Sequence, residues 1–217
     1  MFGLRPGLIM TVEVVAIFSG ALSGALLARS RREYDVVGMA ALAFAAGLGG
    51  SLTRDVLLQQ GTPLALTRGS YLATVATALV VAWFWGHHLG EHTARSIVLL
   101  DALGLGWFAV AGTLRCSSAG LSAASSVLLG VVGAVGGGIL RDILSNEAPA
   151  VFRRGELYAL AALAGALTLV TCRAASLSEV ASAGFAIVVG SGVRLASLRF
   201  GWRSPEPRRP SESREAS

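Results

Sequence analysis

A charged motif occurs twice in the chain, 87 residues apart, and each copy lies inside a long apolar stretch. Glycine lowers the stability of a helix, and a charged side chain inside a bilayer is costly unless something polar uses it. Together these features indicate a polar pathway through a membrane. The two copies comprise Gly49, Gly50, Ser51, Arg54 and Asp55, and Gly136, Gly137, Gly138, Arg141 and Asp142.

Consecutive glycines just before each Arg-Asp pair predict a kink or an unwound turn near the middle of both helices. Such a break frees carbonyl oxygens, which can replace part of a cation's water shell, and amide groups, which favour anions. The alternative is that the glycines are close-packing surfaces for neighbouring helices, a common use of small residues in membranes.

Two acidic residues elsewhere in the apolar sequence are candidate partners for the arginines. Arg54 and Arg141 each lie about five residues past the centre of their span, or about 8 Å from the midplane. Glu13 and Asp101 each lie about five residues into theirs. Depth in the membrane therefore matches Glu13 with Arg54 and Asp101 with Arg141.

The position of the motif aspartates does not by itself identify their partners. Neighbouring side chains on a helix diverge by about 100°, so Asp55 and Asp142 need not pair with the arginine before them. Our hypothesis is that the two inter-helix pairs hold the helices in register, while these aspartates offset the arginine charge along the pathway. The alternative is a purely structural role for all six charges.

The elements that carry these residues are apolar spans. Hydrophobic residues make up 53% of the 217 and charged residues 14%, and the charges avoid several runs of about 20 residues, the length that crosses a bilayer. The composition predicts an all-α integral membrane protein with seven transmembrane helices and a short disordered tail at 201–217. The predicted spans are 8–28, 36–58, 70–90, 96–115, 121–145, 155–173 and 179–199.

The duplication extends beyond the motif. Tyr71 and Tyr158 share the 87-residue offset, and Glu13 and Asp101 are offset by 88. Spans one to three therefore match spans four to six, and because three is odd, the two units run in opposite directions. The predicted organisation is one three-helix repeat at 1–93, an inverted repeat at 94–175, a seventh helix at 176–200 and the tail. Both tyrosines mark span starts and are interpreted as interfacial anchors.

Arginine distribution predicts the orientation, because basic residues near spans favour the cytoplasm. Eleven arginines fall on one side and four on the other, which places the C-terminus inside and the N-terminus outside. All 18 basic residues are Arg, typical of a GC-rich bacterial gene, and the expected location is the bacterial plasma (inner) membrane. The larger group is Arg29, Arg31, Arg32, Arg95, Arg153, Arg154, Arg199, Arg203, Arg208, Arg209 and Arg214, and the smaller is Arg5, Arg68, Arg115 and Arg173.

Several classes of function find no support in the sequence. The arginines act as topology signals between spans, so the net charge of +5 does not indicate nucleic-acid binding. No arrangement of His, Cys or Ser resembles a catalytic nucleophile, and no spacing predicts a metal or cofactor site. Cys116 and Cys172 are either inert buried thiols or, since both lie near one membrane face, a disulfide.

The sequence resembles one known family, the prokaryotic trimeric intracellular cation (TRIC) channels, also known as an uncharacterised membrane family and as glycine transporters. The resemblance covers about Glu13 to Trp202. It rests on the doubled Gly-Gly-x-x-x-Arg-Asp motif followed by Pro63 or Pro149, on Leu-Asp-Ala-Leu-Gly at 100–104, and on Arg-Arg-Gly-Glu-Leu-Tyr at 153–158.

The resemblance implies a homotrimer whose protomers each have seven helices and their own pore, lined partly by glycine-kinked second and fifth helices. It also implies conduction of monovalent cations, chiefly potassium, with the motif residues at the pore. Ser51 departs from the family's triple glycine, so only the fifth span carries the complete motif.

Two other functions stay open on the sequence. A secondary transporter for a small solute such as glycine has the same architecture of inverted repeats and broken midplane helices. A structural or assembly protein of the membrane is disfavoured, because it leaves the duplicated intramembrane charges without a use.

Overall fold

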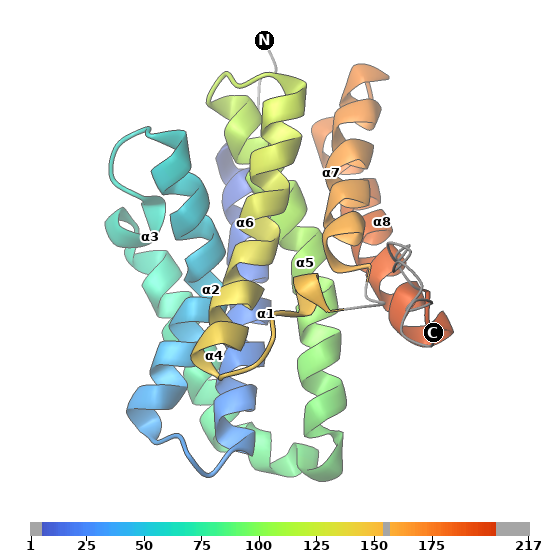
Figure 1. The fold of residues 1–217 in the computed structure, drawn as a ribbon. Coiled ribbons are helices and arrows are strands. Elements are labelled where there is room, and N and C mark those ends of the chain that lie inside the picture. Colours follow the sequence, from blue (N-terminus) through green and yellow to red (C-terminus); the bar gives the residue numbers. More distant parts are fainter. Residues whose placement is uncertain (1–5, 154–156, 203–217) are drawn as a thin grey trace, which may run out of the picture.

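The structure is a computed structural model that describes residues 6–153 and 157–202 (Figure 1). Within these ranges every regular element is a helix, as predicted. The predicted tail lies outside the described residues from 203 onward. The elements are α1 (Pro6–Ser30), α2 (Val36–Leu58), α3 (Leu64–Thr67), α4 (Gly69–Trp85), η1 (Gly86–His92), α5 (Thr93–Ser118), α6 (Ala123–Leu144), η2 (Ala150–Phe152), α7 (Tyr158–Ala174) and α8 (Glu179–Phe200).

The seven long helices confirm the predicted spans, with ends that differ by a few residues. Five stretches of the described chain are long and apolar enough to cross a membrane, and one of them, 69–118, contains both α4 and α5. The last turns of the predicted third span form the 3-10 helix η1 instead of α-helix. Helices α4 and α7 have 17 residues each and are shorter than the other five, and both are apolar.

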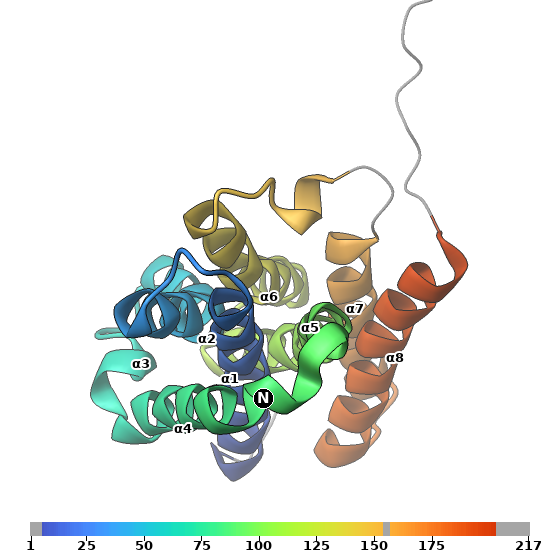
Figure 2. The same cartoon turned by 90° about the horizontal axis from the view of Figure 1, so that it is seen from below.

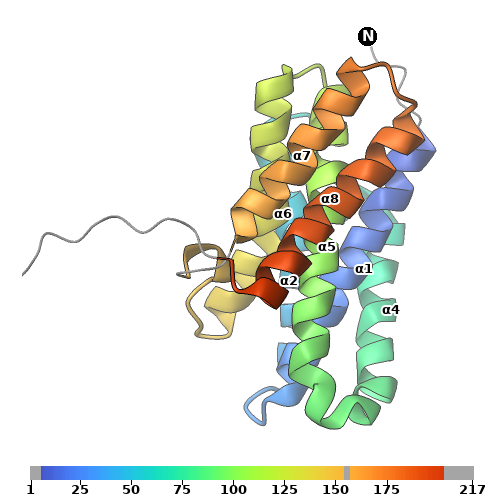
Figure 3. The ribbon, with the colours of Figure 1, turned by 90° about the vertical axis from the view of Figure 1, so that its right-hand side faces the viewer.

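The two repeats lie in opposite directions in the bundle. In Figure 1, α1 descends and α5 ascends, and α2 ascends while α6 descends. Helix α1 packs against α2, α4 and α5, while α6 contacts both α2 and α5. These four helices, α1, α2, α5 and α6, form the centre of the molecule. The end-on view in Figure 2 and the side view in Figure 3 show α7 and α8 together on one flank.

The glycine clusters lie where α2 and α6 cross. Both helices continue without interruption through these residues, so of the two predicted forms of break at Gly49–Ser51 and Gly136–Gly138 the unwound turn is wrong, and the kink stays a prediction. A Cβ built on Gly136 would lie 3.1 Å from the Cα of Gly50. The missing side chains let the two backbones come into contact, and this close-packing use is the alternative that the sequence left open.

Substitution at the crossing should destabilise the protein. A Cβ on Gly50 would overlap the carbonyl oxygen of Gly133 and lie 3.0 Å from the amide nitrogen of Gly137. We expect Gly50→Ala to cost about 1–3 kcal/mol through overpacking, measured by thermal unfolding in detergent. Gly184→Ala is the matched control in α8, where a Cβ meets nothing within 4 Å. Equal melting temperatures for the two variants would contradict the packing role.

Candidate functional site

The first charged cluster joins α1, α2 and α4 inside the bundle. Nη2 of Arg54 lies 2.8 Å from Oε1 of Glu13 and 2.7 Å from Oδ1 of Asp55. The hydroxyl of Tyr71 donates to Oε2 of Glu13. The side chains of Arg54 and Glu13 are each only 2% exposed, so the pair has little access to water.

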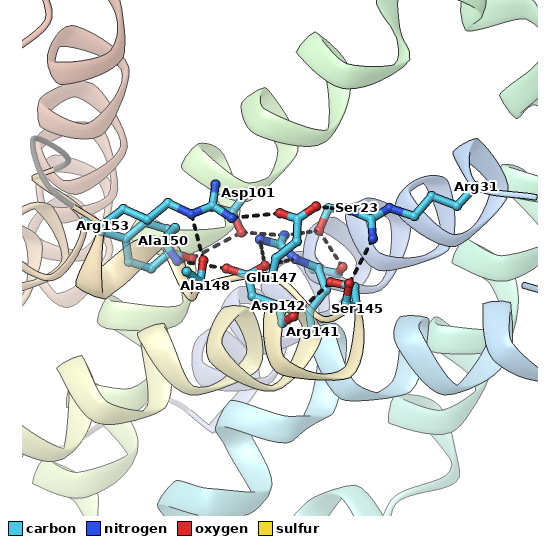
Figure 4. Close-up of polar contacts among 12 residues, drawn as sticks. Ser23, Arg31, Asp101, Arg141, Asp142, Ser145, Glu147, Ala148, Ala150 and Arg153 are labelled. Atoms are coloured by element: carbon cyan, nitrogen blue, oxygen red, sulfur yellow. Dashed lines mark hydrogen bonds and ion pairs between the residues drawn. The ribbon is translucent and has the colours of Figure 1, made fainter. Parts of the chain in front are cut away.

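The second cluster repeats this arrangement with α5, α6 and α7 (Figure 4). Nη1 of Arg141 donates to Oδ1 of Asp101 at 2.8 Å and to the hydroxyl of Ser23 at 3.1 Å. Its Nε and Nη2 donate to Oδ1 of Asp142 at 3.0 and 2.8 Å. The hydroxyl of Tyr158 donates to Oδ1 of Asp101 at 3.2 Å.

Each motif aspartate also ties down the segment that follows its helix. Oδ2 of Asp55 accepts a hydrogen bond from the amide of Leu64 at 3.0 Å, and Oδ2 of Asp142 accepts one from Ala150 at 2.9 Å. A proline precedes each of these amides, and α3 and η2 begin there. The aspartates therefore connect the arginines to the two loops that return the chain toward α4 and α7.

The geometry confirms both ion pairs that depth in the membrane predicted, Glu13 with Arg54 and Asp101 with Arg141. The pairing within each Arg-Asp dipeptide, which the sequence did not require, is also present. The long arginine side chain turns back toward its neighbour, so the 100° between adjacent positions on a helix does not separate the two charges.

The interpretation of Tyr71 and Tyr158 as interfacial anchors is wrong. Their exposed fractions are 2% and 3%, and both hydroxyls donate to the acid of their cluster. The sequence contained the signal, because both tyrosines obey the same repeat offset as the motif. A tyrosine that only anchors a helix in the membrane interface needs no acidic partner. The repetition of each tyrosine together with an acid therefore indicated a contact between the two.

Sequence reasoning also missed Arg194 in α8. This arginine is 3% exposed, and its guanidinium carbon lies 4.8 Å from the centre of the Tyr158 ring, in cation–π geometry. An arginine in the middle of the apolar segment 179–199 was the available signal. Through Arg194 the seventh helix, which lies outside the repeat, contacts the second cluster.

Cavities open beside both clusters. A cavity of about 230 Å³ beside the second cluster is lined by Asp101, Arg141 and Asp142 and reaches Glu147 in the loop after α6. One of about 280 Å³ beside the first cluster is lined by Glu13, Tyr71, Arg68 and Arg115 among others. A third, of only about 10 Å³, lies among α1, α2, α5, α6 and α7, with room for about one water.

A salt bridge lies at the loop end of the 230 Å³ cavity. Glu147 pairs with Arg31 from the loop between α1 and α2, and with Arg153 at 2.7 Å. Figure 4 shows the two arginines approaching Glu147 from opposite sides. At the equivalent place in the other repeat, Gln60 donates to the carbonyl of Ala119 at 3.2 Å, so that contact is neutral.

The three charged side chains that form the ion pairs of each cluster carry a net negative charge. One guanidinium and two carboxylates give a formal charge of −1 when all are ionised, and this count leaves out the arginines at the adjoining cavities, among them Arg194 on the second side and Arg68 and Arg115 on the first. A buried excess of negative charge in a medium of low dielectric constant attracts a cation and repels an anion.

Cys116 and Cys172 are free thiols in the structure, so the disulfide alternative is not present.

Removing either buried arginine should destabilise the protein, but to different extents. Arg54→Gln leaves two carboxylates buried without their cation, which costs about 3–5 kcal/mol. Arg141→Gln should cost less, because its partner Asp101 is 13% exposed and borders the cavity, where water can reach it. Thermal unfolding in detergent measures both.

Arg153→Gln is the control for loss of an arginine, since its side chain is 40% exposed and its ion pair contributes at most about 1 kcal/mol. A melting temperature for Arg54→Gln as high as that of Arg153→Gln would show that the first cluster does not stabilise the fold.

Comparisons with known proteins agree with this architecture. A family model described as "Glycine transporter" matches residues 10–87 and 98–174, one segment in each half of the chain. A UPF0126 membrane protein of Deinococcus radiodurans is 38% identical over 71% of this chain and 72% of its own. The UPF0126 inner membrane protein YadS of Escherichia coli strain K12 is 28% identical over 91% of this chain and 95% of its own.

The fold also matches a solved structure. The TRIC trimeric intracellular cation channel orthologue of Rhodobacter sphaeroides superposes with a TM-score of 0.83 and 31% identity, over 89% of this chain and 98% of that one. The sequence resemblance to TRIC channels is thereby confirmed. The chain therefore belongs to the membrane protein family whose model is described as "Glycine transporter", and its relatives include UPF0126 membrane proteins and a solved TRIC channel orthologue.

Proposed function

We propose that the protein is a passive channel for monovalent cations, chiefly potassium, with a pathway inside each protomer. The observation that carries the proposal is the pair of inverted clusters, each with a formal charge of −1 and each beside a cavity. Cations would pass between the cavities through the small space among α1, α2, α5, α6 and α7. The similarity in fold to a cation channel supports this proposal, and its neighbours in structure are channels rather than enzymes.

A carrier for glycine or a similar small solute is the second candidate, favoured by the description of the family model. A bound zwitterion needs separate partners for its carboxylate and its ammonium group. The half-helix ends of a broken helix could supply both partners. Helices α2 and α6 are continuous, so they offer no such ends at the glycine clusters. Arg68 and Arg115 in the 280 Å³ cavity, and Arg153 and Arg194 in the 230 Å³ cavity, are side chains suited to a carboxylate.

Recording from purified protein in a planar bilayer under a potassium gradient separates the two functions. We expect unitary current steps that reverse near the potassium equilibrium potential, because a channel lets cations pass down their own gradient and does not couple them to a second solute. Saturable, electroneutral glycine uptake into liposomes, with no current steps, would replace the channel by a carrier.

We further propose that the protein is a homotrimer in the bacterial inner membrane, with its N-terminus outside and its C-terminus in the cytoplasm. The names of the similar proteins, one a trimeric channel and one an inner membrane protein, support the assembly and the location. The excess of arginine on one side supports the orientation. Native mass spectrometry measures the assembly, and a 22.3 kDa monomer would contradict it.

Fusions at the C-terminus test the orientation in cells. We expect a green fluorescent protein fused after Ser217 to fluoresce, and alkaline phosphatase at the same position to be inactive, because the C-terminus is cytoplasmic. Phosphatase fused in the loop between α1 and α2 should also be inactive, and in the loop between α2 and α4 it should be active. The reverse pattern would invert the molecule.

A further inference from the structure

Asp101 differs from the other three carboxylates of the clusters in having one unused oxygen. Both oxygens of Asp55 and Asp142 accept a hydrogen bond from an arginine or a backbone amide. In Glu13, Oε2 accepts from Tyr71, and Oε1 is in ion-pair contact with Arg54 at 2.8 Å without a hydrogen bond. Oδ1 of Asp101 accepts from both Arg141 and Tyr158. Among the described residues, none donates a hydrogen bond to its Oδ2.

The carboxylate of Asp101 borders two cavities. The side chain of Asp101 is 13% exposed, against 2% for its repeat counterpart Glu13. Asp101 lines the 230 Å³ cavity and also the 10 Å³ cavity deeper in the bundle. The carboxylate therefore stands where the wide cavity meets the narrow one.

The walls of the narrow cavity leave room for an ion beside this carboxylate. Gly20, Gly104 and Gly138 line it and present no side chains. The hydroxyls of Ser23 and Tyr158 lie in the same wall and already contact the cluster, so further oxygen atoms surround the space. A cation that has lost part of its water shell needs such oxygen ligands.

The charge of the site suits a monovalent ion that binds weakly. Arg141 lies 2.8 Å from Oδ1 of Asp101 and cancels most of its field, and with Asp142 these three side chains carry a net charge of −1. Arg194 lines the wide cavity but not the narrow one. A divalent ion is usually held by several carboxylate and carbonyl oxygens. Within the described residues, no three His, Cys, Asp or Glu side chains are placed to hold a metal. Weak binding is what conduction requires, because the ion must also leave.

We infer that Oδ2 of Asp101 is a ligand of a transient binding site for a monovalent cation at the junction of the two cavities. This inference rests on the proposed function, since it names the place where the permeating ion loses part of its water. Glu13 has no such role, because Arg54 lies 2.8 Å from its Oε1, its side chain is only 2% exposed, and it does not line the narrow cavity. The two halves of the inverted repeat are therefore alike in structure and different in ion contact.

Binding is tested by thermal unfolding of the purified protein in detergent, with KCl exchanged for choline chloride at constant ionic strength. A ligand that binds the folded state raises the melting temperature. We expect a potassium-dependent rise in the wild type and in Glu91→Gln, an acid-to-amide control at an exposed position in η1. The rise should be lost in Asp101→Asn, and its retention there would overturn the site.

A second variant covers the possibility that Asp101→Asn does not fold. Asp101→Glu keeps a carboxylate that can pair with Arg141. Its side chain is longer by one methylene group, so the carboxylate oxygens are displaced. We expect the potassium concentration that gives half of the rise to differ from that of the wild type. An unchanged concentration would overturn the site.

Conduction separates this inference from the proposed function. If the wild type conducts, Asp101→Asn should lower the unitary conductance several-fold and Asp101→Glu should change the ratio of potassium to sodium permeability. Wild-type values in both variants would overturn the site and leave the channel intact. A wild type without current, but with a potassium-dependent rise that Asp101→Asn abolishes, would overturn the channel and support the site.

Discussion

Two arginines buried between apolar helices set the main constraint on this fold. A guanidinium that has lost its water is tolerated only where carboxylates and hydrogen-bond acceptors replace that water. Arg54 and Arg141 each find one acid on the first helix of their repeat and a second in the next residue. The acid on the first helix also accepts from a tyrosine, and the aspartate next to the arginine accepts from a backbone amide. Each arginine therefore links the three long helices of its repeat.

This constraint explains why part of the site could be predicted from the sequence. The depth of a charge in a span is fixed by counting residues, and a duplicated motif doubles the information, so both inter-helix pairs were predictable. The contacts of Tyr71 and Tyr158 were not, because a tyrosine at a span end serves equally well at an interface or in a buried cluster. Only the position of the next helix, which no local pattern gives, decides between them.

The glycine clusters show the same limit more clearly. Consecutive glycines weaken a helix and also allow another backbone to approach, and the two effects predict opposite structures. In the fold the second effect prevails, because α2 and α6 cross at Gly50 and Gly136 and each gains a neighbour in place of a break. Gly138 has a further reason to lack a side chain, since a Cβ there would lie 2.7 Å from the hydroxyl of Tyr158.

The differences between the two repeats are concentrated on the side of the second cluster. Burial makes the clusters the strong part of the molecule, whereas the bridge of Glu147 to Arg31 and Arg153 is partly exposed, and such pairs contribute only about 0–1 kcal/mol. The loops at this end can therefore separate without loss of the arginine clusters beneath them. The buried clusters and the partly exposed bridge above them therefore differ in strength, and the bridge is the weaker of the two.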